Sequence, residues 1–274
     1  MLLHAPAKLN LCLYLGPARG DGRHEIRSLF EPLSLADEIE VTESERDEVV
    51  CPQLGRDNLA GRALAALRRR GWDGPPLRIR ITKRIPVAGG LGGGSTDAAA
   101  VLRLARDEVE GIEELAAEIG ADVPSQLHPD LLLVGGAGEK LEPLPSPGEH
   151  AVVLLPSREG LSTTAVYAEA DSLGLGRDAG ELQTLEERLR EAASGGASPL
   201  EYAHLLVNDL EPAAIALHPG IEPALESLRG AGAARALITG SGPTAFGLFA
   251  DPESAQAAAS GLGESAIVCT PGAP

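Results

Sequence analysis

The sequence predicts a mixed α+β protein, built as one large domain or two modest domains that share a cleft. The chain has 274 residues and 43% hydrophobic residues, which is enough for a sizeable core. An alternating segment at residues 77–82 predicts a strand, and a helix is predicted after it from apolar residues at helical spacing, namely Ala98, Val101, Leu102, Ala105 and Val109. A proline-rich segment at residues 143–148 predicts a domain boundary, with one domain over residues 1–147 and another over 148–274.

The composition restricts the possible partners. The formal net charge is −17, whereas nucleic acids and anionic membranes call for a basic surface. The three cysteines are scattered, no apolar run is long enough to span a membrane, and the first residues lack the pattern of a signal peptide. We therefore expect a cytoplasmic protein that binds neither nucleic acid nor membrane.

A glycine-rich segment dominates the sequence at residues 83–97, which read KRIPVAGGLGGGSTD. Five glycines in six residues lie between a predicted strand and a predicted helix, whose first N–H groups can bind an anion. The spacing excludes the G-x-G-x-x-G dinucleotide fingerprint, and the absence of lysine after the last glycine excludes a Walker loop. The pattern indicates a phosphate-binding loop of a third type, with a glycine-rich turn that binds no ligand as the alternative.

Lysine is rare enough to be informative. Of 23 basic residues only Lys8, Lys83 and Lys140 are lysines. Since arginine is the usual basic residue of this chain, each lysine is a candidate for a role that arginine cannot fill. Lys8 lies in residues 7–15, which alternate as a half-buried strand, and it shares the polar face of that strand with Asn10. A solvent-exposed face and a cleft-facing one are both open from the pattern alone.

Local signals predict several further elements. Asp57 and Asn58 cap a helix that runs to residue 70, and Gly120 ends a short helix over residues 113–119. Residues 151–155 predict a buried strand, residues 181–193 a long helix, residue 251 the start of a terminal helix and residues 266–270 a last strand. Residues 237–244, LITGSGPT, predict a second glycine turn between two strands.

The run from Pro86 to Ala98, PVAGGLGGGSTDA, resembles the ATP loop of the GHMP kinases, the superfamily of galactokinase, homoserine kinase and mevalonate kinase. The resemblance implies an N-terminal domain like ribosomal protein S5 and a ferredoxin-like α/β C-terminal domain. It implies ATP and Mg²⁺ as cofactors, with Ser95 as a weak candidate metal ligand. The residues implied to bind ATP are Pro86, Val87, Ala88, Gly89, Gly90, Leu91, Gly92, Gly93, Gly94, Ser95 and Thr96.

Two further motifs imply the catalytic residues. Residues 5–10, APAKLN, resemble the first kinase motif of the superfamily, which places Lys8 beside the hydroxyl that accepts the phosphoryl group. Residues 120–124, GADVP, resemble the run that contains the proposed catalytic base, which is Asp122 here. Without the resemblance, an aspartate after a helix-ending glycine is more often a turn former.

The triple glycine before Ser95 is similar to the superfamily member whose substrate is a cytidine diphosphate-linked methylerythritol, so a small-molecule substrate phosphorylated at its 2-hydroxyl is implied. The residues implied to bind it are Asn10, Arg23, His24, Tyr167, Gly240 and Ser241. The chain departs from that pattern at Arg23, where a tyrosine that stacks on the cytosine is usual; an arginine can also stack on a base. It departs again at Ser125 and Gln126, which imply a more polar wall around the methylerythritol.

Other parts of the resemblance are coarser. Residues 28–39 resemble the second and third strands of the superfamily, and residues 208–212, NDLEP, a helix beside the cleft. Two alternatives stay open: a related kinase that acts on another alcohol, and a nucleotide-binding sensor that has lost catalysis. We expect a monomer or a weak homodimer.

Overall fold

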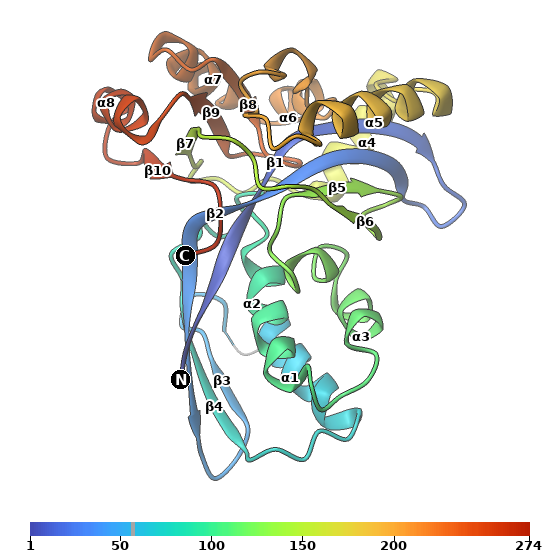
Figure 1. Cartoon of the computed structure of the whole chain (residues 1–274), viewed down its shortest axis with the longest axis vertical. Helices are drawn as coiled ribbons and strands as arrows, with labels where there is room; N and C mark the ends of the chain where they lie inside the picture. The colour runs from blue at the N-terminus through green and yellow to red at the C-terminus, as the bar shows by residue number, and fades with distance from the viewer. Residues whose placement is uncertain (56–57) are drawn as a thin grey trace.

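The computed structural model describes residues 1–55 and 58–274. Asp57, predicted with Asn58 as a helix cap, lies outside the described residues. The chain forms two sheets, each covered by helices (Figure 1). The mixed α+β class is therefore confirmed.

The first sheet belongs to the N-terminal half. Its strands are β1 (Leu2–Ala18), β2 (His24–Glu43), β3 (Glu48–Val50), β4 (Leu77–Thr82), β5 (Leu132–Gly135) and β6 (Lys140–Pro143). The order is β3-β4-β2-β5-β6, and β1 pairs with β2. Neighbours are antiparallel except β3 and β4. The helices of this half are α1 (Leu59–Arg69), α2 (Gly93–Leu102) and α3 (Ile112–Ile119).

The second sheet belongs to the C-terminal half. Its strands are β7 (Ala151–Leu155), β8 (Arg235–Ile238), β9 (Ala245–Phe249) and β10 (Ile267–Cys269), in the antiparallel order β10-β7-β9-β8. The helices are α4 (Thr163–Leu173), α5 (Ala179–Ala193), α6 (Glu211–Leu217), α7 (Ile221–Gly230) and α8 (Pro252–Leu262). The expected domain boundary after residue 147 falls between β6 and β7 and stays a prediction.

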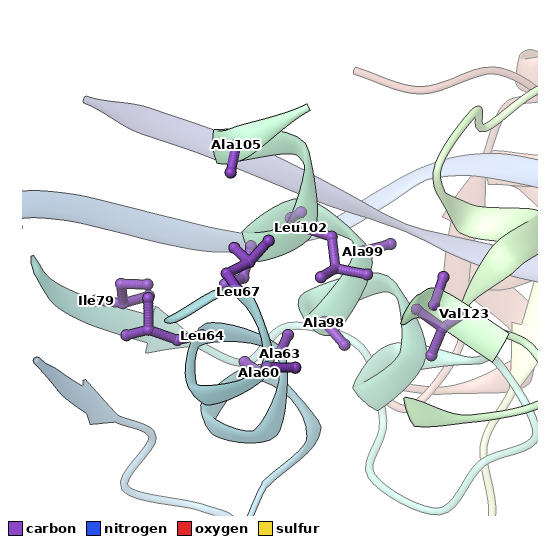
Figure 2. Packing of buried hydrophobic residues seen from close by; sticks show 14 of the residues in the cluster. Ala60, Ala63, Leu64, Leu67, Ile79, Ala98, Ala99, Leu102, Ala105 and Val123 are labelled. Atoms are coloured by element: carbon purple, nitrogen blue, oxygen red, sulfur yellow. The ribbon is translucent and has the colours of Figure 1, made fainter. Parts of the chain in front are cut away.

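The packing of α1 against α2 positions the glycine loop. Asn58 caps α1, because its side chain accepts a hydrogen bond of 2.9 Å from the amide of Gly61, and Gly71 ends the helix at φ +93°. The apolar stripe of α1 faces α2, where Ala63 lies beside the small side chain of Ala98 (Figure 2). Alanines let the two helices approach closely. The N-terminus of α2 is therefore held by a well-packed core.

The prediction that residues 7–15 form a half-buried strand is wrong, because both faces of β1 are buried. Lys8 and Asn10 on the polar face are only 5% and 2% exposed. The reason is that the C-terminal half packs along this strand: the amide of Leu13 donates to the carbonyl of Val207, and the hydroxyl of Tyr14 donates to that of Leu205. Local alternation cannot show that a distant segment covers the second face.

Two other expectations need correction. Residues 28–39 lie in one continuous strand, β2, rather than in two. The helix after the glycine loop ends at Leu102, and Val109 lies beyond it, because a 3₁₀ turn over Arg103–Ala105 and a following turn keep the same apolar spacing toward the core. The helix expected at residues 208–212 begins only at Glu211, after a bridge and a turn at residues 208–210. The other predicted elements, including the short helix that Gly120 ends and the turn between β8 and β9, are confirmed.

Candidate active site

The glycine loop lines a cavity of about 330 Å³. Of the residues expected to bind ATP, all from Pro86 to Ser95 line it, whereas Thr96 is fully buried beneath the loop. Gly93 and Gly94 are already in the first turn of α2, and Gly92 precedes that helix at φ +69°. The first amides of α2 have no partner within the helix and are available to an anion.

The second glycine turn, between β8 and β9, presses against this loop. A Cβ at Gly90 would lie 2.6 Å from the carbonyl oxygen of Thr239 and 2.9 Å from that of Gly242. Gly90 also has φ +77°, which an L side chain rarely adopts. The two turns therefore meet as backbone against backbone, and no larger residue fits at Gly90.

A second cavity, of about 510 Å³, shares Gly90 and Gly92 with the first. Every other residue proposed for catalysis or substrate binding lines it: Lys8, Asn10, Arg23, His24, Asp122, Tyr167, Gly240 and Ser241. These residues come from both halves of the chain, so the fold gathers them at the junction of the two sheets. A phosphate donor in one cavity and an acceptor in the other would meet at the shared glycines.

Lys8 and Asp122 lie side by side at this junction. The Lys8 ammonium is 3.3 Å from the Asp122 carboxylate, 2.6 Å from Oδ1 of Asn10 and 4.3 Å from the centre of the Phe30 ring. The amide nitrogen of Asn10 donates in turn to the hydroxyl of Ser28 at 2.9 Å. A buried cation next to a partly exposed carboxylate can stabilise negative charge that develops beside the pair.

The opposite end of the second cavity is built around His24. Its Nε2 atom is 2.8 Å from Oδ1 of Asp171, and its ring centre is 5.4 Å from that of Tyr167. Burial and the nearby charge of Asp122 raise the pKa of Tyr167 to about 12. Arg23 lines the same end, but its guanidinium is bonded to Asp21 at 2.9 and 3.1 Å.

Sequence reasoning missed Asp171 and Thr163, which also line the second cavity. Both are on α4, four residues on either side of Tyr167, so they share its face of the helix. That spacing was the available signal once Tyr167 was a candidate. Ser125 and Gln126 were wrongly expected in the substrate wall: both are buried behind Asp122, where the hydroxyl of Ser125 donates to its carbonyl at 2.8 Å.

Lys83, the second of the three lysines, forms a buried ion-pair cluster. It is buried between two carboxylates, Asp37 on β2 and Asp97 on α2, and its distance to Asp97 is 2.7 Å. Burial raises the pKa of Asp97, the Asp37 charge adds to this, and Lys83 opposes both. Burial alone would lower the pKa of Lys83, but the two carboxylates raise it. Asp97 therefore acts in the structure as a partner of Lys83.

Comparison with known proteins decides the family. Residues 58–130 match the model of the GHMP kinases N terminal domain, and residues 179–267 match that of the GHMP kinases C terminal. The chain is 39% identical to 4-diphosphocytidyl-2-C-methyl-D-erythritol kinase of Streptomyces avermitilis, over 95% of this chain and 91% of the relative. It is 42% identical to the enzyme of the same name from Thermobifida fusca, over 95% and 90%. The chain belongs to the 4-diphosphocytidyl-2-C-methyl-D-erythritol kinase family.

Solved structures agree with this assignment. A crystal structure of 4-(cytidine 5'-diphospho)-2C-methyl-D-erythritol kinase superposes with a TM-score of 0.83 at 36% identity and covers 99% of each chain. Mevalonate kinase from L. major, with a TM-score of 0.69 at 15% identity, covers 100% of this chain and shares the fold. The GHMP two-domain fold and an ATP-dependent small-molecule kinase activity, both expected from the glycine loop, are confirmed.

Two negative findings concern only the residues described. Within residues 1–55 and 58–274, no helix has the length and apolar character needed to cross a bilayer. In the same residues, no three side chains of histidine, cysteine, aspartate or glutamate gather as a metal-binding cluster. The expected cytoplasmic location and oligomeric state stay predictions.

Proposed function

We propose that this member of the 4-diphosphocytidyl-2-C-methyl-D-erythritol kinase family transfers the γ-phosphoryl group of ATP to the 2-hydroxyl of 4-diphosphocytidyl-2-C-methyl-D-erythritol. The observation that carries the proposal is the Lys8–Asp122 pair at the point where the two cavities meet. Names of relatives and a shared fold support the substrate, and the pair supports the reaction.

In this mechanism Asp122 is the base. Its carboxylate takes the proton of the 2-hydroxyl as the oxygen attacks the γ-phosphorus, a new P–O bond forms, and the bond to the leaving ADP breaks. Lys8, held by Asn10, lies beside Asp122 and offsets negative charge on the migrating phosphoryl group. The amides at the start of α2 would bind the phosphates of ATP.

The magnesium ion expected with ATP fits this loop only in part. Mg²⁺ is usually held by one or two carboxylates together with substrate phosphates and water, and it supplies charge neutralisation. Ser95 lines the loop cavity and can contribute its hydroxyl, whereas Asp97 is buried and bonded to Lys83. We infer that the phosphates and water supply most of its ligands, with Ser95 as the side-chain candidate.

The two alternatives make different predictions. A sensor without catalysis has no need of a buried lysine beside a carboxylate in the acceptor cavity, so the Lys8–Asp122 pair counts against it. A kinase for another alcohol would keep the pair but would not be inhibited by CMP. Competition of turnover by CMP therefore separates the proposed substrate from other alcohols.

The direct test measures ADP release with the proposed substrate for wild type and for Asp122→Asn. We expect kcat to fall by about 10²–10⁴-fold in the variant, the usual contribution of a positioned base, while ATP affinity is kept. Asp130→Asn, at an exposed position eight residues further on, is the matched control and should keep wild-type turnover. Undiminished turnover in Asp122→Asn would remove Asp122 as the base, and no turnover in wild type would refute the substrate.

A further inference from the structure

The histidine end of the second cavity contains an unassigned acidic residue, Asp171. It lies on α4, one helical turn after Tyr167, and it lines the cavity together with His24 and Tyr167. Its side chain is 58% exposed, whereas that of His24 is only 8% exposed. A buried ring is thus held by a carboxylate that also faces the space where a ligand would lie.

The bond between them fixes one polar edge of the imidazole. The Asp171 carboxylate can only accept, so Nε2 of His24, 2.8 Å from its Oδ1, carries the hydrogen. In the neutral ring Nδ1 is then an acceptor. Among the described residues, neither Nδ1 of His24 nor Oδ2 of Asp171 makes a hydrogen bond. This end of the cavity therefore offers two unused acceptors.

The charges along the cavity orient a nucleotide-like ligand. Lys8 and the N-terminus of α2 lie at the end next to the glycine loop, where phosphate groups are favoured. Asp171 lines the other end, where phosphate would meet its carboxylate, and the charge of Arg23 at that end is paired with Asp21. A pyrimidine nucleotide would enter with its base toward His24 and Tyr167.

Two acceptors select between the pyrimidine bases. Cytosine carries an exocyclic amine, which donates, at the position where uracil carries a carbonyl oxygen, which accepts. We propose that Asp171 is a specificity-determining residue, which selects cytosine over uracil by locking His24 as an acceptor and by offering its own second oxygen. The inference rests on the proposed function, since it assigns the base discrimination of that same acceptor site.

The test compares the affinities of CMP and UMP, measured by calorimetry with the glycine loop saturated by a non-hydrolysable ATP analogue. The two ligands share ribose and phosphate, so the ratio of their dissociation constants reports the base edge alone. In wild type we expect CMP to bind at least about fivefold more tightly than UMP, as for one well-made base contact.

Two variants give opposite, specific expectations. In Asp171→Asn the amide oxygen still accepts from His24, so the amide nitrogen replaces the free carboxylate oxygen and donates into the cavity; the preference should fall to one or invert toward UMP. In Asp171→Ala the carboxylate oxygen is lost and His24 is no longer fixed in one tautomer, so the ratio of the two dissociation constants should approach one. Glu169→Gln removes the same charge from the same helix outside the lining of the cavity, and should keep the wild-type ratio.

A nitrogen-15 spectrum of the histidines adds a readout that a merely structural role would not change. His24 should show the Nε2–H tautomer in wild type and in Asp171→Asn, and a mixture in Asp171→Ala. An Asp171→Asn variant with the wild-type ratio would overturn the role of Asp171 and leave the kinase proposal standing. If the wild-type protein binds CMP and UMP equally, the role of Asp171 is likewise overturned and the kinase proposal stands. If it binds neither nucleotide, both the role of Asp171 and the proposed substrate are overturned.

Discussion

The orientation of one buried amide, that of Asn10, decides what the Lys8 ammonium contacts. The Ser28 hydroxyl has a single hydrogen and donates it to the carbonyl of Cys12, so it must accept from the Asn10 amide nitrogen. The Asn10 oxygen is then turned toward Lys8. Ser28 does not line the second cavity, yet its hydroxyl fixes which atom of the Asn10 amide faces Lys8, the proposed catalytic lysine.

Replacement of Ser28 by alanine should therefore reduce turnover without weakening ATP binding. The Asn10 amide would lose its fixed direction and turn its nitrogen toward Lys8 part of the time, which we expect to cost about tenfold in kcat. Steady-state kinetics of ADP release would measure this. Ser34→Ala, an exposed serine on the same strand, is the control, and equal kcat in the two variants would contradict the prediction.

At the scale of elements, a second buried lysine, Lys83, has two unequal partners. Asp37 on β2 accepts from Lys83 and from the backbone amides of Arg84 at 2.6 Å and Ile85 at 2.9 Å, so it fixes the start of the glycine loop. Asp97 on α2 has only Lys83, and its Oδ1 is buried without a hydrogen-bond partner among the described residues. Both carboxyl groups are buried, but Asp37 accepts several hydrogen bonds, whereas Asp97 accepts one.

We expect Asp37→Asn to destabilise the fold by about 3 kcal/mol, because it breaks a buried, multiply bonded pair. Asp97→Asn should destabilise the fold by less than about 1 kcal/mol at pH 8: burial outweighs Lys83 and raises the pKa of Asp97, so the ionised carboxylate gives the folded state no net stabilisation, and asparagine still accepts from Lys83. Urea unfolding at pH 8 measures both.

Glu38→Gln is the matched control, because Glu38 is next to Asp37 but forms a surface pair with the exposed Arg84, worth about 1 kcal/mol or less. Equal losses of stability in Asp37→Asn and Asp97→Asn would refute the inequality of the two carboxylates.

These elements also show which features the sequence could predict. The glycine loop, its flanking strand and helix, and the cap at Asn58 depend on neighbours within a few residues, and the structure has all of them. Asp37 and Lys83 are 46 residues apart, and only the pairing of β2 with β4 brings them together. No local pattern contains that information. The catalytic positions were available only through the resemblance, which matches motifs rather than distances.

At the scale of the whole molecule, the two halves are joined by their longest strands (Figure 1). β1 and β2 extend from the N-terminal sheet into the part that contains β7–β10, where Leu13 pairs with Asn208 and Leu33 with Pro271. The cavity proposed to bind the substrate therefore lies between two halves that β1 and β2 connect directly. A buried ion pair adds to this connection: Glu31 on β2 contacts His150, which directly precedes β7.

Both ring nitrogens of His150 face acceptors. Nδ1 is 2.9 Å from the carbonyl oxygen of Gly148 and Nε2 is 3.1 Å from the carboxylate of Glu31, so the ring is best satisfied when both nitrogens carry hydrogen. Burial opposes this charge, but the Glu31 contact outweighs it and raises the pKa of His150 above its ordinary value of 6.5. The pair therefore stabilises the fold fully below about pH 6.5, and this contribution is lost as the pH rises through the higher pKa of the folded state.

Removal of the imidazole should reveal this dependence. We expect His150→Gln to be less stable than wild type by about 3 kcal/mol at pH 6, because the buried Glu31 side chain loses its contact with the imidazolium. The difference in the free energy of unfolding between wild type and His150→Gln should decrease toward pH 9, since the wild-type protein loses a stabilisation that the variant never had. Urea unfolding of both proteins from pH 6 to pH 9 measures this difference in stability. The contributions of other titrating groups are the same in both proteins and cancel. His204→Gln, at an exposed histidine, should follow wild type throughout. A gap between wild type and His150→Gln that stays constant from pH 6 to pH 9 would mean that the imidazole is not the charged partner of Glu31.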